Sequence, residues 1–205
     1  MDHHASATAS LVRRARLVAG ALPLVLLAAC SRGSNTDGEG WRRLLNGTDL
    51  SGWNVVGDAN WEIADGAVGA NKGTGFLVTP MAYGDFQIVA DIWVDADANS
   101  GIFVRCQDPK MITAMNCYEV NIFDKRPDPA YRTGAIVNIA KPAAMIDAAG
   151  KWNTLDITAH GTHLMVTLNG TKTVDVQDKM FAKGVIALQY GAGTVKFRNV
   201  RFRTL

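Results

Sequence analysis

The chain has 205 residues, of which 48% are hydrophobic and 20% are charged, with 21 Lys and Arg against 19 Asp and Glu. Removing residues 1–29 would take away three Arg and one Asp, which leaves 18 basic against 18 acidic side chains. The remaining composition therefore excludes a strongly basic nucleic-acid-binding protein and suits one domain with no nucleic-acid partner.

The first 29 residues have the pattern of a signal peptide. Arg13, Arg14 and Arg16 precede an apolar run over 17–29. That run is about 13 residues long, which is shorter than the ~20 residues that a membrane-spanning helix needs. It ends Leu-Ala-Ala before Cys30, in the manner of a lipobox. We therefore expect cleavage before Cys30 and lipidation of its thiol; the alternative is an ordinary signal peptide followed by a free cysteine.

A lipidated Cys30 would tie the protein to a membrane, since acyl chains contribute ~0.8 kcal/mol for each buried CH₂. Ser31, and not Asp, follows the cysteine. By the sorting rule of Gram-negative bacteria this favours the outer membrane, facing the periplasm or the exterior. The Gly- and Ser-rich segment up to residue 40 predicts a flexible tether, so we expect a lipidated cysteine and tether over 30–40 and a domain over 41–205.

Beyond Gly40, short apolar-alternating segments are separated by turn residues, which is typical of antiparallel strands. Asp65-Gly66 and Asn169-Gly170 predict tight hairpin turns, and a change of phase near Asn199 predicts a bulge. Residues 142–149 could form a short helical turn or a loop. The expected strands are 61–64, 67–70, 85–94, 101–106, 117–123, 134–139, 152–159, 163–168, 171–176, 185–190 and 194–203. This pattern predicts an all-β, two-sheet antiparallel β-sandwich or jelly roll, with a closed barrel as the alternative.

Alternation along two of these strands separates an apolar face from a mixed face. Burial of the apolar face between the sheets would enclose Ile102, Val104, Tyr118, Val120 and Ile122. The opposite face would then present an aromatic ring, a guanidinium, a carboxylate and an amide, from Phe103, Arg105, Glu119 and Asn121. Such a set suits a sugar-binding surface, although a structural Arg105–Glu119 ion pair on a solvated face is the competing interpretation.

Cys106 and Cys117 are the two cysteines left besides Cys30, and outside the cytoplasm such a pair predicts a disulfide. Strict alternation places Cys106 with the core residues and Cys117 with the opposite face, whereas opposed partners share a face. The bond therefore requires either a bulge or a ladder that ends before the cysteines.

Several sequence blocks in fixed order resemble a known family. They are WRRLLNGTDLSGW (41–53), NSGIFVR (99–105), YEVNIFD (118–124), TGAI (133–136), KWN (151–153), VIALQYG (185–191) and VKFRNV (195–200). Together they cover nearly all of 41–205 and resemble the 3-keto-disaccharide hydrolase domain. The resemblance implies a fold similar to concanavalin A-like lectins and glucanases. It also implies an extracytoplasmic hydrolase that acts on 3-keto glycosides.

The expected site does not hold two carboxylates as ordinary glycosidases do. Glu119 and Asp124 would lie ~16 Å apart along one strand, whereas such pairs lie about 5–9.5 Å apart. Asp124 must then sit past the strand end. A 3-keto sugar needs only a base for its C2 proton and a cation for the enolate, and Glu119 and Arg105 suit these roles. We thus expect Glu119, Arg105 and Asp124 as catalytic residues and Phe103, Asn121, Tyr131, Lys141 and Gln189 as substrate contacts.

No cofactor is expected, although a structural divalent cation is compatible with the fold. His160 and His163 flank Gly161 and are expected to be surface histidines, not a metal pair. A carbohydrate ligand and a lipid-mediated membrane contact are the expected partners. A non-catalytic carbohydrate-binding module and a scaffold domain of an envelope complex remain the alternatives to a hydrolase.

Overall fold

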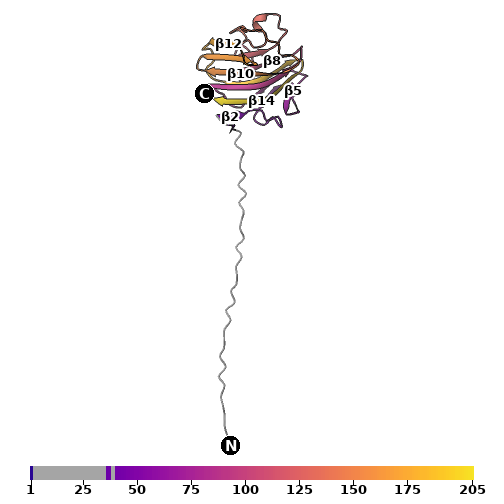
Figure 1. Ribbon diagram of the computed structural model, residues 1–205, viewed down its shortest axis with the longest axis vertical. Coiled ribbons are helices and arrows are strands. Elements are labelled where there is room, and N and C mark those ends of the chain that lie inside the picture. The colour runs from indigo at the N-terminus through magenta and orange to yellow at the C-terminus, as the bar shows by residue number, and fades with distance from the viewer. Residues whose placement is uncertain (2–35, 38–39) are drawn as a thin grey trace. The chain divides into compact units, whose positions relative to one another are not determined.

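The computed structural model describes Met1 and residues 36–37 and 40–205 (Figure 1). The chain divides into two units, 1–33 and 34–205, and the description below concerns the second. The expected signal peptide, the lipidation at Cys30 and most of the expected tether lie outside the described residues. Among the residues that are described, no helix is long and apolar enough to cross a membrane.

Two antiparallel sheets make up the second unit. The larger sheet follows the order β1 (Thr36–Asp37), β2 (Trp41–Arg43), β14 (Val195–Thr204), β7 (Phe86–Val94), β10 (Trp152–His160), β11 (His163–Leu168) and β12 (Thr171–Gln177). It also contains β5 (Ala67–Ala70), which pairs with β14, and β4 (Glu62–Ala64), which pairs with β5. Figure 1 shows β12, β10, β14 and β2 following one another across this sheet.

The smaller sheet follows the order β3 (Asn54–Gly57), β6 (Gly75–Val78), β13 (Val185–Ala192), β8 (Asn99–Cys106) and β9 (Tyr118–Ile122). A 3₁₀ turn, η2 (Pro129–Tyr131), follows β9. The two sheets are separate and every strand pairing within them is antiparallel. The predicted two-sheet sandwich is confirmed, and the closed-barrel alternative is wrong.

The core lies between the sheets and is filled by the apolar faces of alternating strands. From β7 it receives Phe86, Ile88, Ala90, Ile92 and Val94, and from β8 and β9 it receives Ile102, Val104, Tyr118, Val120 and Ile122. All of these side chains are buried, and each large one stabilises the fold by ~1.5–3 kcal/mol through burial. The core assignment made from alternation is therefore confirmed.

The tight turns and the bulge follow from local sequence. Asp65 has φ 54° and Gly66 φ 72°, and Asn169 has φ 53° and Gly170 φ 78°. Positive φ at both central residues is what a type I′ hairpin requires, and Asn, Asp and Gly tolerate it. Asn199 has φ 51°, and the β14–β7 register shifts between Arg198 and Arg201. The predicted hairpin turns and the bulge near Asn199 are confirmed.

Two expectations about segments differ from the structure, and a third, which left a helical turn and a loop as alternatives, is resolved. Residues 134–139 are not a strand, because positive φ at Gly134 (88°) and Asn138 (63°) interrupts the extended chain and leaves isolated bridges at Ile136. Residues 142–149 contain no helix and form a loop. Thr36 and Asp37 pair with β2, so this part of the expected tether is a strand.

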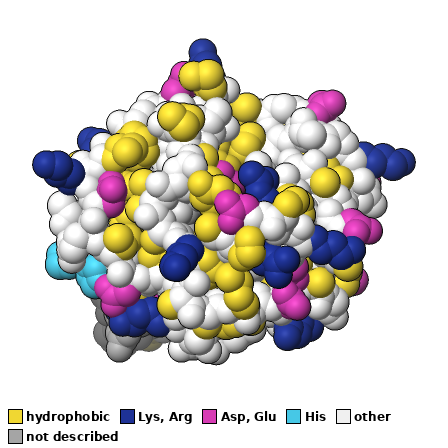
Figure 2. All heavy atoms as spheres, turned by 90° about the horizontal axis from the view of Figure 1, so that it is seen from above, with side chains coloured by type: hydrophobic (Ala, Val, Ile, Leu, Met, Phe, Trp, Pro, Cys, Tyr) yellow, Lys and Arg dark blue, Asp and Glu magenta, His cyan; other side chains and the backbone are white. Residues whose placement is uncertain are grey.

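Charged side chains of both signs are interspersed on the face shown in Figure 2, with apolar atoms between them. Neither Lys and Arg nor Asp and Glu gather there into a single-sign patch. This distribution agrees with the near balance of charge in the domain sequence.

Candidate functional site

Two rows of cross-strand neighbours line the outer face of the smaller sheet. One row is Asn54, Val78, Ala187, Phe103 and Glu119, and the other is Val56, Phe76, Gln189, Gly101 and Asn121. Directly opposed residues share a sheet face, so each row runs across all five strands. The expectation that Phe103, Glu119 and Asn121 share the face away from the core is confirmed.

An apolar floor underlies this face. Phe103 is only 2% exposed, and its ring packs edge-on against Phe76 with 5.4 Å between centroids. Ile112, from the loop between β8 and β9, packs into the same apolar cluster, as do Cys106 and Cys117. Phe103 was expected to contact substrate, but its ring is covered, so it supports the face without presenting a stacking surface.

Glu119 is the charged residue of this face. Its side chain is half-buried beside Phe103, and within residues 40–205 its carboxylate makes no hydrogen bond or ion pair. Burial raises the pKa of Glu119 to about 7, while the positive charge of Arg126 acts to lower it. A carboxyl with this pKa exists in both protonation states near neutral pH, which is the condition for efficient general acid–base catalysis.

The cation that acts on Glu119 comes from the loop after β9. The Arg126 guanidinium lies 5.6 Å from the ring centre of Phe123 and 6.0 Å from that of Tyr131. These rings hold the side chain on the loop that adjoins the outer face. Sequence reasoning missed Arg126, because a loop residue carries no periodicity that could indicate where it points.

Arg105 does not share the face of Glu119, and that expectation is wrong. Cys106 pairs with Val185 and Phe103 with Ala187, so three steps along β8 correspond to two along β13. The extra residue in β8, together with φ 54° at Arg105, reverses the alternation there. The Arg105 side chain leaves the outer face and becomes fully buried, with 0% exposure.

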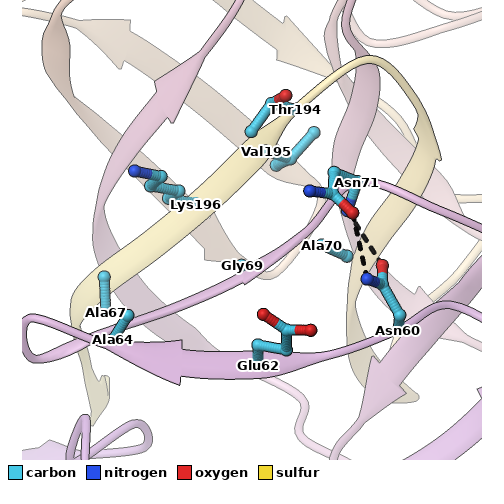
Figure 3. Close-up of a pocket in the computed structure, with 10 residues that line it drawn as sticks. All are labelled: Asn60, Glu62, Ala64, Ala67, Gly69, Ala70, Asn71, Thr194, Val195 and Lys196. Atoms are coloured by element: carbon cyan, nitrogen blue, oxygen red, sulfur yellow. Dashed lines mark hydrogen bonds between the residues drawn. The ribbon is translucent and has the colours of Figure 1, made fainter.

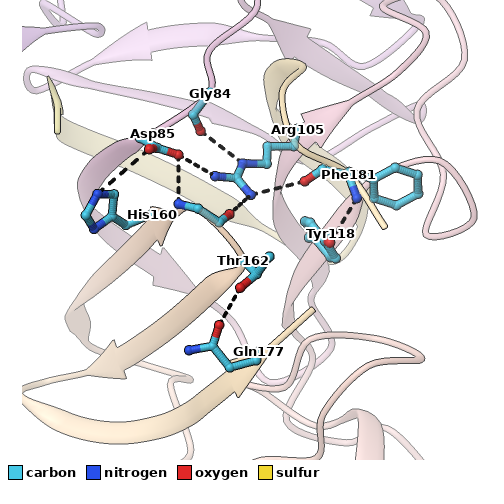
Figure 4. Close-up of polar contacts among 9 residues, drawn as sticks. Gly84, Asp85, Arg105, Tyr118, His160, Thr162, Gln177 and Phe181 are labelled. Carbon is cyan, nitrogen blue, oxygen red and sulfur yellow. Dashed lines mark hydrogen bonds and ion pairs between the residues drawn. The ribbon is translucent and has the colours of Figure 1, made fainter. Parts of the chain in front are cut away.

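Every nitrogen of the buried Arg105 guanidinium has a protein partner (Figure 4). Nε donates to the Gly84 carbonyl at 2.9 Å, and Nη1 donates to the carbonyls of Gly161 (2.8 Å) and Phe181 (3.1 Å). Nη2 donates to Asp85 at 3.0 Å. Burial lowers the pKa of Arg105, and the charge of Asp85 opposes that effect. Arg105 thus holds three loops together, and its buried guanidinium does not lie on the outer face, where it could stabilise an enolate beside Glu119.

The same bulge explains the disulfide. By reversing the alternation after Phe103, it turns Cys106 toward the face on which Cys117 lies, and the two form a disulfide. The predicted bond is confirmed, and both conditions considered for it are met: β8 has a bulge, and the β8–β9 ladder ends at Val104 and Tyr118, before the cysteines. One local distortion therefore joins the cysteines and removes Arg105 from the outer face.

Asp124 lies past the end of β9, as expected, but its carboxylate connects loop segments through hydrogen bonds. It accepts hydrogen bonds from the Thr133 hydroxyl (2.5 Å) and from the backbone N–H groups of Ala148 and Ala149 (2.8 Å each). None of these contacts links it to Glu119. The residue also lines a cavity of about 390 Å³ together with Ala96, Lys125, Arg132, Asp147 and Ala149.

The expected substrate contacts on and near this face differ in their availability. The Asn121 amide donates to the Tyr131 carbonyl and its oxygen accepts from the Ile122 N–H, so Asn121 holds the loop of Tyr131. Gln189 differs, because its buried Oε1 has no hydrogen-bond partner and lies beside Gly101. Lys141 is exposed, and its contact with substrate stays a prediction.

The two histidines lie near separate carboxylates although they are opposed in the β10–β11 register. His160 lies 3.8 Å from Asp85, and His163 lies 2.7 Å from Asp175. Among the described residues, no three His, Cys, Asp or Glu side chains come together as a possible metal site. The structural cation considered from the sequence stays a prediction.

Comparisons with known proteins agree with this architecture. A family model described as a 3-keto-alpha-glucoside-1,2-lyase-like domain matches residues 40–203. A levanase of Bacillus subtilis is 25% identical over 158 residues, which cover 75% of this chain and 23% of that protein. The chain thus spans about a quarter of the length of this curated relative.

Solved structures share the sandwich. A candidate glycosyl hydrolase of Parabacteroides distasonis superimposes with a TM-score of 0.74 at 23% identity, over 82% of this chain and 94% of that one. The carbohydrate-binding module CBM66 of Bacillus subtilis superimposes with a TM-score of 0.60 at 21% identity, over 75% and 96%. At these identities the likeness concerns the fold.

Proposed function

The chain belongs to the family of 3-keto-alpha-glucoside-1,2-lyase-like domains, and we propose that it cleaves the glycosidic bond of 3-keto glycosides outside the cytoplasm, anchored through Cys30. The single observation that carries this proposal is Glu119, an unpaired carboxylate on an apolar face with a pKa of about 7. Similarity to glycosyl hydrolase-like and carbohydrate-binding proteins supports a sugar as the ligand.

The proposed reaction needs one base. A carbonyl at C3 acidifies the C2–H bond, so Glu119 removes that proton and the electron pair forms an enolate. The enolate collapses to a C1–C2 double bond as the C1–O bond breaks, and the leaving oxygen takes up a proton. Water then adds at C1 while C2 regains a proton, so the net result is hydrolysis. A base with a pKa near the working pH suits the first step.

In this proposal Arg126, and not Arg105, is the cation that stabilises the enolate. Its charge already acts on Glu119, and the same charge would favour an enolate formed next to that carboxylate. An apolar floor strengthens both interactions because it limits screening by water.

The test is turnover of a chromogenic 3-keto glucoside beside its unoxidised parent. Glu119→Gln should lower turnover by roughly 10²–10⁴-fold, the usual contribution of a general base, and should leave binding of the substrate intact. The matched control is Asp97→Asn, which removes an exposed carboxylate that pairs with Lys125. Equal turnover by Glu119→Gln and the wild type would refute the assignment of Glu119 as base.

A non-catalytic carbohydrate-binding module is the second candidate function. The face around Glu119 offers no second carboxylate for an ordinary glycosidase mechanism, and the sandwich resembles CBM66. Measurable binding of both glucosides without release from either would favour the module over the enzyme.

A further inference from the structure

A notch of about 110 Å³ opens on the outer face of the larger sheet, the sheet that does not contain Glu119 (Figure 3). Glu62 of β4 is opposite Gly69 of β5, and Gly69 is opposite Lys196 of β14. Because the middle residue has no side chain, a gap is left between its neighbours. A Cβ on Gly69 would lie 2.9 Å from the Val195 carbonyl, so close strand packing also requires glycine here.

The notch combines small apolar side chains with free polar groups. Ala64 and Ala67 contribute methyl groups. The ammonium of Lys196 lies 5.1 Å from the ring centre of Trp93, so Lys196 lines the notch with the methylene groups of its side chain. In Figure 3 the Glu62 carboxylate points toward Gly69. Glu62 has no hydrogen-bond or ion-pair partner within residues 40–205, so its oxygens are available.

One end of the notch is held rigid. Asn60 and Asn71 bond to each other through their side chains at 3.0 Å, and the Asn60 oxygen also accepts from the backbone N–H groups of Asn71 (3.0 Å) and Lys72 (2.8 Å). Thr194 also lines the notch. A preformed wall of this kind lowers the entropic cost of binding a ligand.

We propose that this notch is a second carbohydrate subsite, which takes the terminal ring of a neutral glycoside. A carboxylate accepts two neighbouring hydroxyls, amide and hydroxyl groups complete the hydrogen bonds, and methyl groups contact the C–H face of the ring. At about 110 Å³, the notch has room for part of one sugar ring. The subsite takes only its ligand class from the proposed function and does not involve Glu119.

Two-dimensional ¹H–¹⁵N NMR of the purified protein tests the subsite, with methyl α-D-glucopyranoside and methyl β-D-fructofuranoside as separate probes. At least one probe should shift the amides of Ala67, Gly69 and Lys196 saturably. Glu62→Gln should weaken that binding about tenfold, because hydrogen bonds to a charged acceptor are the stronger ones. Ala64→Leu, at an exposed edge position, should block it by filling the gap.

Two controls separate this proposal from the catalytic one. Glu119→Gln should lose turnover and keep the amide shifts, and Asp97→Asn should keep the affinity of the wild type. The subsite is refuted if neither sugar shifts these amides, or if Glu62→Gln binds as tightly as the wild type. If tetramethylammonium chloride shifts these amides and neither sugar does, the notch is a cation site, and the carbohydrate subsite is also refuted.

Discussion

Arg105 and Glu119 lie on adjacent strands of the same sheet, yet their surroundings differ in kind. Arg105 is fully buried, and its guanidinium donates to three carbonyls and one carboxylate. Glu119 is half-buried beside apolar side chains, and its carboxylate has no hydrogen-bond or ion-pair partner within residues 40–205. A buried charge with a protein partner at each nitrogen stabilises the fold, whereas an unpaired carboxylate has lone pairs that can accept hydrogen bonds from a ligand. The comparison separates a structural charge from the carboxylate that we propose as the base.

The largest expected effect on stability comes from Arg105→Leu. Removing the guanidinium leaves Asp85 and three loop carbonyls without their partner, so the free energy of unfolding should fall by ~3–5 kcal/mol. Urea unfolding measures this loss. Arg201→Leu, at an exposed residue that lies over Trp41, should cost less than ~1 kcal/mol. An Arg105→Leu protein of normal stability that loses only turnover would return Arg105 to the active site.

The second largest effect on stability should come from removing the disulfide. The bulge that brings its two cysteines to one face also turns Arg105 away from that face. Cys106→Ser with Cys117→Ser should lower the free energy of unfolding by ~3 kcal/mol, the effect expected for closing a short loop. In the wild type, thiol titration after unfolding without reductant should find neither of these cysteines free. Two reactive thiols from this pair would contradict the bond.

Glu119→Gln should stabilise the protein at high pH, in contrast to Arg105→Leu. Burial raises the pKa of Glu119 from 4.5 to about 7, so the folded state holds the proton more tightly than the unfolded state. The contribution of Glu119 to the free energy of unfolding of the wild type is fully present below about pH 4.5, and it is lost as the pH rises through 7. The variant should therefore exceed the wild type by ~3 kcal/mol at pH 8 and nearly match it at pH 4.5. Urea unfolding at both values checks the sign, and a pH-independent difference would contradict it.

The smallest expected effect concerns Tyr118, which borders the buried guanidinium (Figure 4). Its hydroxyl donates to Asp178 at 2.6 Å and accepts from the Phe181 N–H at 3.0 Å. Burial and Asp178 raise the pKa of Tyr118 to about 12, so the hydroxyl stays protonated as a donor. Tyr118→Phe should cost ~1–2 kcal/mol in urea unfolding with turnover unchanged. A large loss of turnover at full stability would extend the reactive region to Tyr118.

Sequence alone determined the features that depend on local chemistry. Strand alternation identified the core residues Val104 and Val120, and Asn169-Gly170 identified a hairpin, because pleat and turn geometry act over a few residues. The order of motifs across 41–205 pointed to the family, which the match over 40–203 shows.

Only the tertiary structure decided the composition of the site. Alternation assumes a regular strand, and one extra residue in β8 sends Arg105 inward and Cys106 outward. The position of Arg126 follows from ring contacts within an irregular loop, and the burial of Phe103 follows from Phe76 of another strand and Ile112 of the β8–β9 loop. These outcomes depend on loop conformation and tertiary packing, and strand periodicity contains no information about either.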